Sequence, residues 1–125
     1  MAAREGFIKV TEPQKYGLKA NDHVLSGVTN AYMVSFYHQL HCIKALQMQF
    51  VTSQMNSSGT TWDSNHANHC FSYLRQAAIC GGDMTLEGLD EDVESGERGI
   101  HGWGTVHICR NWETILDWMH ENAAT

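Results

Sequence analysis

The pentad His-x-x-His-Cys occurs twice in this chain, and it constrains the fold more than any other feature of the sequence. The two copies consist of His38, His41 and Cys42, and of His66, His69 and Cys70. Residues three and four positions apart lie on one face of an α-helix. Each pentad therefore predicts a helix that presents two imidazoles and one thiol from a single surface.

The apolar pattern around the pentads also predicts helices. Apolar side chains recur every three to four residues over residues 30–55, where Asn30 is the N-cap candidate. A second helix is predicted over residues 63–79, ended by Gly81 and Gly82, and a third over residues 111–121. We expect the stripe of the first helix and the tryptophans to form the core: Met33, Phe36, Leu40, Ile43, Leu46 and Phe50, with Trp62, Trp103, Trp112 and Trp118.

The predicted fold is a mainly α single domain over residues 1–125. Residues 1–30 show no sustained period and are interpreted as an extended arm or short strands, with residues 7–10 the best strand. Residues 31–121 form the helical core, in which a central pair of packed helices carries the two pentads. A further short strand is predicted over residues 105–108.

Composition excludes several classes of partner. The formal net charge is -6, and nucleic acids and anionic membrane surfaces both need a basic patch, so neither is expected to bind. No apolar run reaches the about 18 residues that span a bilayer, so we expect no membrane anchor within this chain. The compartment stays open, because the cysteines and a sequon at Asn56 favour the secretory lumen and the missing anchor favours the cytoplasm.

The pentads predict a metal site. Two such helices packed antiparallel are expected to bring His38, His41, His66 and His69 together around one divalent metal or a pair. Imidazole ligands suit copper, zinc, iron or nickel and disfavour magnesium and calcium. Copper is the first choice, because neither pentad contains the carboxylate of a non-haem iron site or the Cys-x-x-Cys of a zinc site.

The remaining candidate residues each have two interpretations. The four cysteines could be thiolate ligands or could form the disulfides Cys42–Cys70 and Cys80–Cys109, and an oxidising metal nearby favours disulfides. His107 could complete the site as a ligand or act as a base, or it could be a half-buried strand residue. Asp83 and Glu87 could contact substrate or act as a base, or they could be plain turn residues.

Several segments together resemble the UstYa-type tailoring oxidases of fungal natural-product clusters. The resemblance rests on both pentads, on Cys80-Gly81-Gly82-Asp83-Met84-Thr85-Leu86-Glu87, and on Gly102-Trp103-Gly104 followed by His107-Ile108-Cys109-Arg110-Asn111-Trp112. It implies oxidative modification of peptides and other small natural products, with copper usually proposed on the four pentad histidines and with Cys42 and Cys70 in the same site. The chain departs from the family in lacking its N-terminal membrane helix and in carrying Asn68, Ser72 and Asn111 where the family tends to have acids.

Three functions are consistent with these residues. The first is a copper-dependent oxidase or cyclase that tailors a peptide or other small secondary metabolite. The second is a non-redox cyclase or isomerase that uses the histidines as acid and base or a metal as Lewis acid. The third is a zinc- or disulfide-stapled interaction module. A homodimer is possible, and the sequence alone does not decide it.

Overall fold

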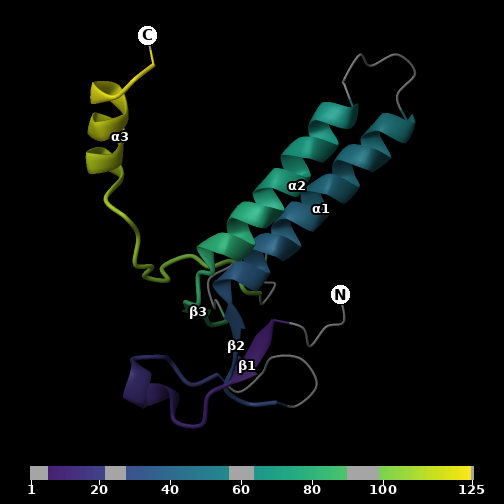
Figure 1. Ribbon diagram of the computed structural model, residues 1–125. Coiled ribbons are helices and arrows are strands. Elements are labelled where there is room, and N and C mark those ends of the chain that lie inside the picture. The colour runs from purple at the N-terminus through teal and green to yellow at the C-terminus, as the bar shows by residue number, and fades with distance from the viewer. Residues whose placement is uncertain (1–5, 22–27, 57–63, 90–98, 125) are drawn as a thin grey trace.

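A helical hairpin stands on a small β-sheet, and one further helix lies apart from both (Figure 1). A computed structural model describes residues 6–21, 28–56, 64–89 and 99–124. In chain order the elements are β1 (Phe7–Lys9), the 3₁₀ helix η1 (Pro13–Tyr16), β2 (Ala31–Val34), α1 (Ser35–Asn56), α2 (Ser64–Gly81), β3 (Leu86–Glu87) and α3 (Trp112–Glu121). The mainly helical single domain predicted from the sequence is confirmed.

The sheet determines where the hairpin begins. Its order is β1-β2-β3, and both pairs are antiparallel. Ile8 lies opposite Tyr32 in the first pair, and Val34 lies opposite Leu86 in the second. Since β2 lies between two partners and α1 starts at the next residue, the sheet fixes the base of α1. The strand predicted near the N-terminus is therefore confirmed as β1.

Apart from Pro13 in η1, the most deeply buried apolar side chains belong to β2. Ala31, Tyr32 and Val34 are buried, and the Tyr32 hydroxyl donates a hydrogen bond of 2.5 Å to the carbonyl oxygen of Lys19. Burial raises the pKa of Tyr32. The buried Asn21 side chain donates to the Ala31 carbonyl oxygen at 2.7 Å. These contacts hold the N-terminal arm on the central strand.

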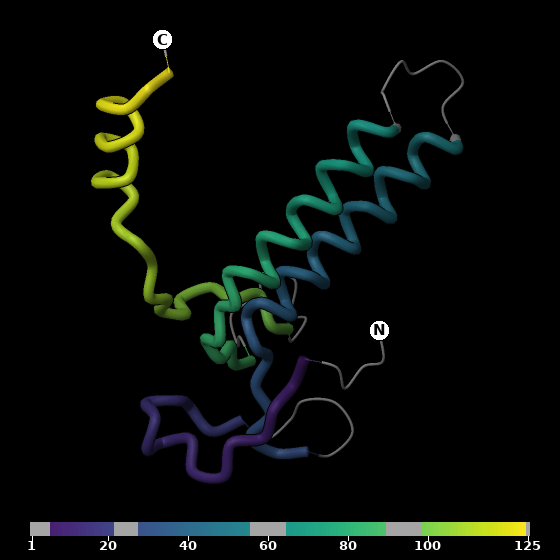
Figure 2. The backbone as a smooth tube through the Cα atoms, in the orientation of Figure 1, coloured from purple at the N-terminus to yellow at the C-terminus, as the bar shows by residue number. Residues whose placement is uncertain are grey.

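Helices α1 and α2 run antiparallel and side by side along their length (Figure 2). The rings of Phe50 and Phe71 lie 5.9 Å apart and fix the register of the pair. Leu40 and Ile43 are half-buried on the same side of α1 as Phe50, as predicted, but Leu46 is 64% exposed and does not belong to this core. None of the described helices is both long enough and apolar enough to span a membrane.

The predicted start of the first helix and one predicted strand are wrong. The helix predicted from residue 30 begins at Ser35, because residues 31–34 form β2 and find hydrogen-bond partners in β1 and β3. Asn30 has a left-handed φ of 54° and lies before the strand, so it is no helix cap. Residues 105–108 form no strand; a turn closed by Thr105 N–H and the Gly102 carbonyl oxygen precedes them. The Asp63 end of the second predicted helix lies outside the described residues.

Helix α3 is well formed but has little packing. Its N-cap is Asn111, whose side-chain oxygen accepts from Thr114 N–H at 3.0 Å, as the predicted start of this helix requires. Trp112 and Trp118 are 65% and 63% exposed, and Figure 1 shows α3 standing apart from the hairpin. Trp103 is also exposed, so the core prediction is wrong for these three tryptophans, while Trp62 lies outside the described residues.

Candidate functional site

The segment 83–87 closes the base of the hairpin. The first backbone N–H groups of a helix have no partner within it. In α1 these groups belong to Ser35 and Phe36, which donate to the carbonyl oxygens of Thr85 and Asp83, both at 2.9 Å. The chain just past α2 is therefore fixed against the first turn of α1, and its two acidic side chains lie at that turn.

Glu87 is the buried centre of this region. Its side chain is almost fully enclosed, and one carboxylate oxygen accepts from the hydroxyl of Ser35 at 2.6 Å. The other oxygen contacts Nδ1 of His38. Gly102 lies over the same carboxylate, since a Cβ at that position would sit 3.3 Å from Oε2. Three segments distant in sequence thus meet at one carboxylate.

A second carboxylate–imidazole pair lies beside the first. Asp83 Oδ2 is 2.7 Å from Nδ1 of His107, and Asp83 Oδ1 accepts from Thr85 N–H at 3.0 Å. The hydrogen bonds from the Thr85 side chain and backbone, together with the contact to His107, lower the pKa of Asp83 against the opposing effect of partial burial. Asp83 is therefore an anion at neutral pH that can hold the His107 ring.

Both pairs present imidazole nitrogens for chemistry. A carboxylate on Nδ1 fixes the tautomer and orientation of a histidine ring and leaves Nε2 to a metal, a substrate or a proton. His38 and His107 are half-buried and share this arrangement. The sequence identified Asp83 and His107 as candidates, but nothing in it indicates that Glu87 is buried against His38 or that Ser35 holds it. That pairing depends on the sheet, which brings β3 to the start of α1.

The second pentad lies at the other end of the hairpin. Because Phe50 packs against Phe71, His66 is level with the last turn of α1, about 20 Å from the first pentad at 1.5 Å per residue. The His66 and His69 rings are 6.4 Å apart, and His69 lies 6.2 Å from the Tyr73 ring. Both histidines are exposed. The antiparallel packing is as predicted, but it separates the pentads instead of joining them.

The pentads also lie on helix faces that point away from the hairpin interface. On α1 the half-buried side chains lie at Leu40, Ile43 and Phe50, whereas His41 and Cys42 are exposed. On α2 the same contrast separates the half-buried Phe71 from its exposed neighbour Cys70. Antiparallel packing of these two helices encloses the two phenylalanines in part and leaves His41, His66 and His69 exposed.

The donors among the described residues do not assemble a metal site within one chain. Within the described residues, no three His, Cys, Asp or Glu side chains come close enough to one another to hold a metal ion. The individual donors suit copper or zinc chemically, and His38 already has the carboxylate partner that ligating histidines commonly use. The prediction that one chain gathers His38, His41, His66 and His69 is not met by the arrangement of its two helices.

The cysteines are free thiols in this structure. Neither disulfide considered from the sequence is formed, and all four cysteines are exposed: Cys42, Cys70, Cys80 and Cys109. Cys80 lies in the last turn of α2, and Cys109 follows His107 in the segment leading to α3. They remain available as thiols on the surface.

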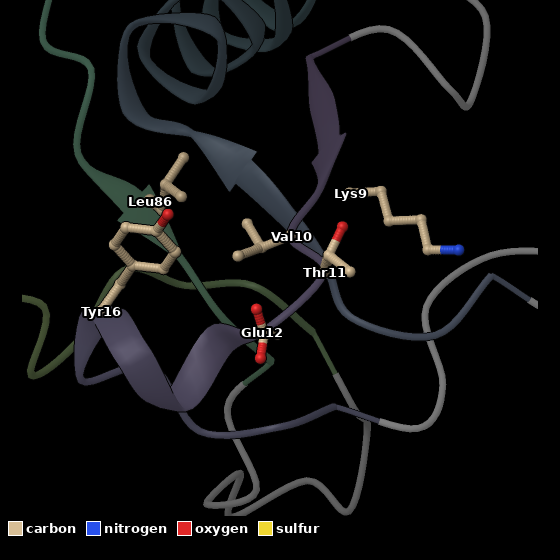
Figure 3. Close-up of a pocket in the computed structure, with 6 residues that line it drawn as sticks. All are labelled: Lys9, Val10, Thr11, Glu12, Tyr16 and Leu86. Atoms are coloured by element: carbon tan, nitrogen blue, oxygen red, sulfur yellow. The ribbon is translucent and has the colours of Figure 1, made fainter.

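A pocket of about 330 Å³ lies on the opposite side of β3 (Figure 3). Its lining residues come from the end of β1, from η1 and from β3: Lys9, Val10, Thr11, Glu12, Tyr16 and Leu86. Successive strand residues point to opposite faces, so Leu86 faces the pocket while Glu87 turns to His38. The pocket therefore does not include the paired histidines.

Comparisons with known proteins agree with the family resemblance found in the sequence. The family model described as mycotoxin biosynthesis protein UstYa matches residues 2–122. The oxidase ustYb of Aspergillus flavus is 31% identical over 94% of this chain and 52% of its own length. The UstYa family oxidase phomYb of Diaporthe leptostromiformis is 37% identical over 74% of the chain and 36% of its own length, and the hydroxylase cctR of Talaromyces islandicus is 30% identical over 74% and 34%.

The chain spans about half the length, or less, of these curated relatives. No solved structure matches it. The family model nevertheless covers nearly every residue, including both pentads, the 83–87 segment and His107. This chain belongs to the UstYa family.

Proposed function

We infer that this chain carries the catalytic part of a metal-dependent oxidase or oxidative cyclase that tailors a peptide or other small secondary metabolite. Support comes from relatives named as oxidases and as a hydroxylase and from a family described by mycotoxin biosynthesis. The excess of histidine, eight residues against eight lysines and arginines, agrees with a site built on imidazole. Copper is the metal we propose.

The observation that carries this proposal is the pair of carboxylate–imidazole contacts at the base of the hairpin. Glu87 holds the His38 ring through Nδ1, and Asp83 holds the His107 ring through Nδ1. Each contact orients a ring and leaves Nε2 free of that carboxylate. A buried carboxylate such as Glu87 is costly to enclose unless its partners are fixed, so its position argues for a defined role in orienting His38.

Copper would be held by imidazoles of the pentads, and when bound it would supply one-electron chemistry with dioxygen. The described side chains of one chain do not gather around a metal ion. What this chain does on its own is to orient His38 and His107 and to offer each a carboxylate that stabilises the protonated ring. A proton taken from substrate at Nε2 of either ring would be stabilised in this way.

A non-redox cyclase or isomerase is the second candidate, and the same two pairs favour it. Both pairs are complete within one chain and need no metal to act as acid and base. The two candidates differ in one requirement. An oxidase consumes an oxidant, whereas an isomerase turns over in its absence.

The first experiment measures copper in the purified chain after loading with Cu(II) and removal of unbound metal. We expect near-stoichiometric copper in the wild type, much less in His38→Ala, and an intermediate content in Glu87→Gln, because an orienting carboxylate is worth about 10–100-fold in metal affinity. His120→Ala on α3 is the matched control and should bind as the wild type does.

Oxygen uptake driven by ascorbate then tests the redox interpretation without a known substrate. Copper-loaded wild type should consume dioxygen, and His38→Ala should consume it much more slowly at equal protein concentration. Equal copper content in wild type and His38→Ala would contradict the assignment of the first pentad. A chain that binds no copper while remaining folded would leave the acid–base candidate as the function.

A further inference from the structure

Ser35 is the most deeply buried polar residue that the structure describes. It has no exposed surface, and among the described residues its hydroxyl bonds to one partner, the Glu87 carboxylate. Enclosing a hydroxyl costs free energy unless it is hydrogen-bonded, so its place beside the candidate site calls for a reason. The two explanations that its position allows are a helix cap and a hold on the carboxylate.

Helix capping does not account for the Ser35 hydroxyl. A serine at the start of a helix usually accepts a hydrogen bond from a backbone N–H two or three residues further along. In α1 the N–H groups of Ser35 and Phe36 donate to the carbonyl oxygens of Thr85 and Asp83, and the Ser35 hydroxyl donates to Oε1 of Glu87 at 2.6 Å. The segment 83–85 therefore supplies part of the cap and leaves the hydroxyl to the carboxylate.

Two side chains of α1 hold the two oxygens of the Glu87 carboxylate. Ser35 bonds to Oε1 and Nδ1 of His38 contacts Oε2, and these two residues lie three positions apart on one face of the helix. The last torsion of a glutamate side chain is broad, so a carboxylate held at one oxygen can turn about its terminal bond. With both oxygens held, Oε2 stays directed at the imidazole.

The second carboxylate–imidazole pair repeats this arrangement. Asp83 Oδ1 accepts from the Thr85 N–H at 3.0 Å, while Oδ2 lies 2.7 Å from Nδ1 of His107. In both pairs one oxygen is fixed by a separate donor and the other oxygen faces the ring. The repetition supports a common way of orienting the two imidazoles, in which Ser35 is the separate donor of the first pair.

We propose that Ser35 is a positioning residue for His38 and acts through Glu87. Its hydroxyl sets the rotation of the carboxylate, the carboxylate accepts from Nδ1–H, and the ring is kept in the tautomer whose Nε2 carries no proton. Such an Nε2 can ligate copper or accept a proton from substrate. The consequence for copper rests on the proposed function, whereas the tautomer of the ring does not depend on it.

The tautomer of His38 in the metal-free chain is the direct test. Heteronuclear NMR of the ¹⁵N-labelled imidazoles at mildly alkaline pH should place the His38 proton on Nδ1 in the wild type and show a mixture of both tautomers in Ser35→Ala. Ser53→Ala is the matched control, because it removes an exposed hydroxyl from the same helix and should leave the His38 signals unchanged.

A second variant protects this test against loss of the fold. Ser35→Cys keeps the shape of the side chain but is a weak donor, so it should also give a mixture of tautomers if Ser35→Ala does not fold. Far-UV circular dichroism checks that each variant keeps its helices. A His38 ring that remains entirely in the Nδ1–H tautomer in the folded Ser35 variants overturns the proposal.

Copper affinity then separates action through Glu87 from a general loss of order. Ser35→Ala should weaken Cu(II) binding about 2- to 10-fold, the value of one hydrogen bond. In a Glu87→Leu background the same substitution should have no effect, because both partners are then apolar. An equal loss in the two backgrounds overturns the proposal. A wild type that binds no Cu(II) refutes the proposed metal, and the His38 tautomer then decides the positioning role alone.

Discussion

The two pentads have the same pattern of residues but different surroundings. The first begins one turn into α1 and has the Glu87 carboxylate against His38, with Ser35 and Gly102 closing around that carboxylate. The second stands at the other end of the hairpin, exposed, with the Tyr73 ring 6.2 Å from that of His69. A ligand motif on a helix fixes only which side chains share a face, whereas the orientation of each ring depends on what the rest of the fold brings to it.

The largest loss of stability should come from removing the Glu87 carboxylate, which only the first pentad has. Glu87→Ala leaves the buried Ser35 hydroxyl and the His38 ring without their partner, so we expect the free energy of unfolding to fall by about 2–3 kcal/mol. Urea denaturation measures it. Ser53→Ala, which removes an exposed hydroxyl near the tip, should cost under about 0.5 kcal/mol. Equal losses of unfolding free energy in Glu87→Ala and Ser53→Ala would mean that the base of the hairpin is no more ordered than its far end.

A smaller effect is expected where the chain passes over that carboxylate. Gly102 and Gly104 have nearly the same left-handed φ, 77° and 76°, but only at Gly102 would an added Cβ lie within 4 Å of Glu87. Both alanine substitutions should cost about 1 kcal/mol for backbone conformation. Gly102→Ala should cost about 1 kcal/mol more, because the new methyl group crowds Glu87. Thermal unfolding of the two variants side by side would show the difference, and identical midpoints would remove Gly102 from the site.

The smallest effect is on the acid side of the stability profile. The pKa of Asp83 is lowered in the folded chain, so this group stabilises the fold above the ordinary range of aspartate near about 3.9, and the contribution is lost as the pH falls through the lowered folded value. Since the pair is partly exposed, we expect about 0.5–1 kcal/mol. Asp83→Asn should flatten the slope of unfolding free energy between about pH 5 and pH 2.

The control for that profile is Asp117→Asn on the exposed face of α3, which should leave the slope unchanged. Helices α1 and α2 contain no acidic residue, so the hairpin should add no carboxylate titration of its own in this range. A slope that both variants alter alike would show that net charge, and not the contacts of Asp83 with Thr85 and His107, governs acid stability.

The helices could be predicted from the sequence because their signals are local. Spacing of apolar residues, the stop at Gly81 and the start of the last helix near Asn111 depend only on neighbours within a few positions, and all three agree with the structure. The start of α1 could not be placed in this way, because residues 31–34 take their conformation from β1 and β3, which lie far away in the chain. The pairing of Glu87 with His38 has the same origin.

The separation of the pentads could not be predicted for a related reason. Helical spacing places His38 and His41 on one face, but it does not say which residues of α2 lie level with them. The Phe50–Phe71 contact marks that register. The exposure of Trp112 and Trp118 is equally beyond the sequence, because amphipathicity predicts an apolar face without naming what covers it.

The Ser35–Glu87 hydrogen bond joins residues 52 positions apart, and this has a consequence for the order of folding. A helical hairpin rests on near-neighbour contacts and can form quickly, whereas a link across that much chain must wait for the loop to close. We therefore expect the base of the hairpin to assemble late and to open before the helices do. Amide hydrogen exchange would then report faster opening at Ser35 and Phe36 than in the middle of α1. The Ser35–Glu87 pair would thus serve both the chemistry of the site and the last step of its folding.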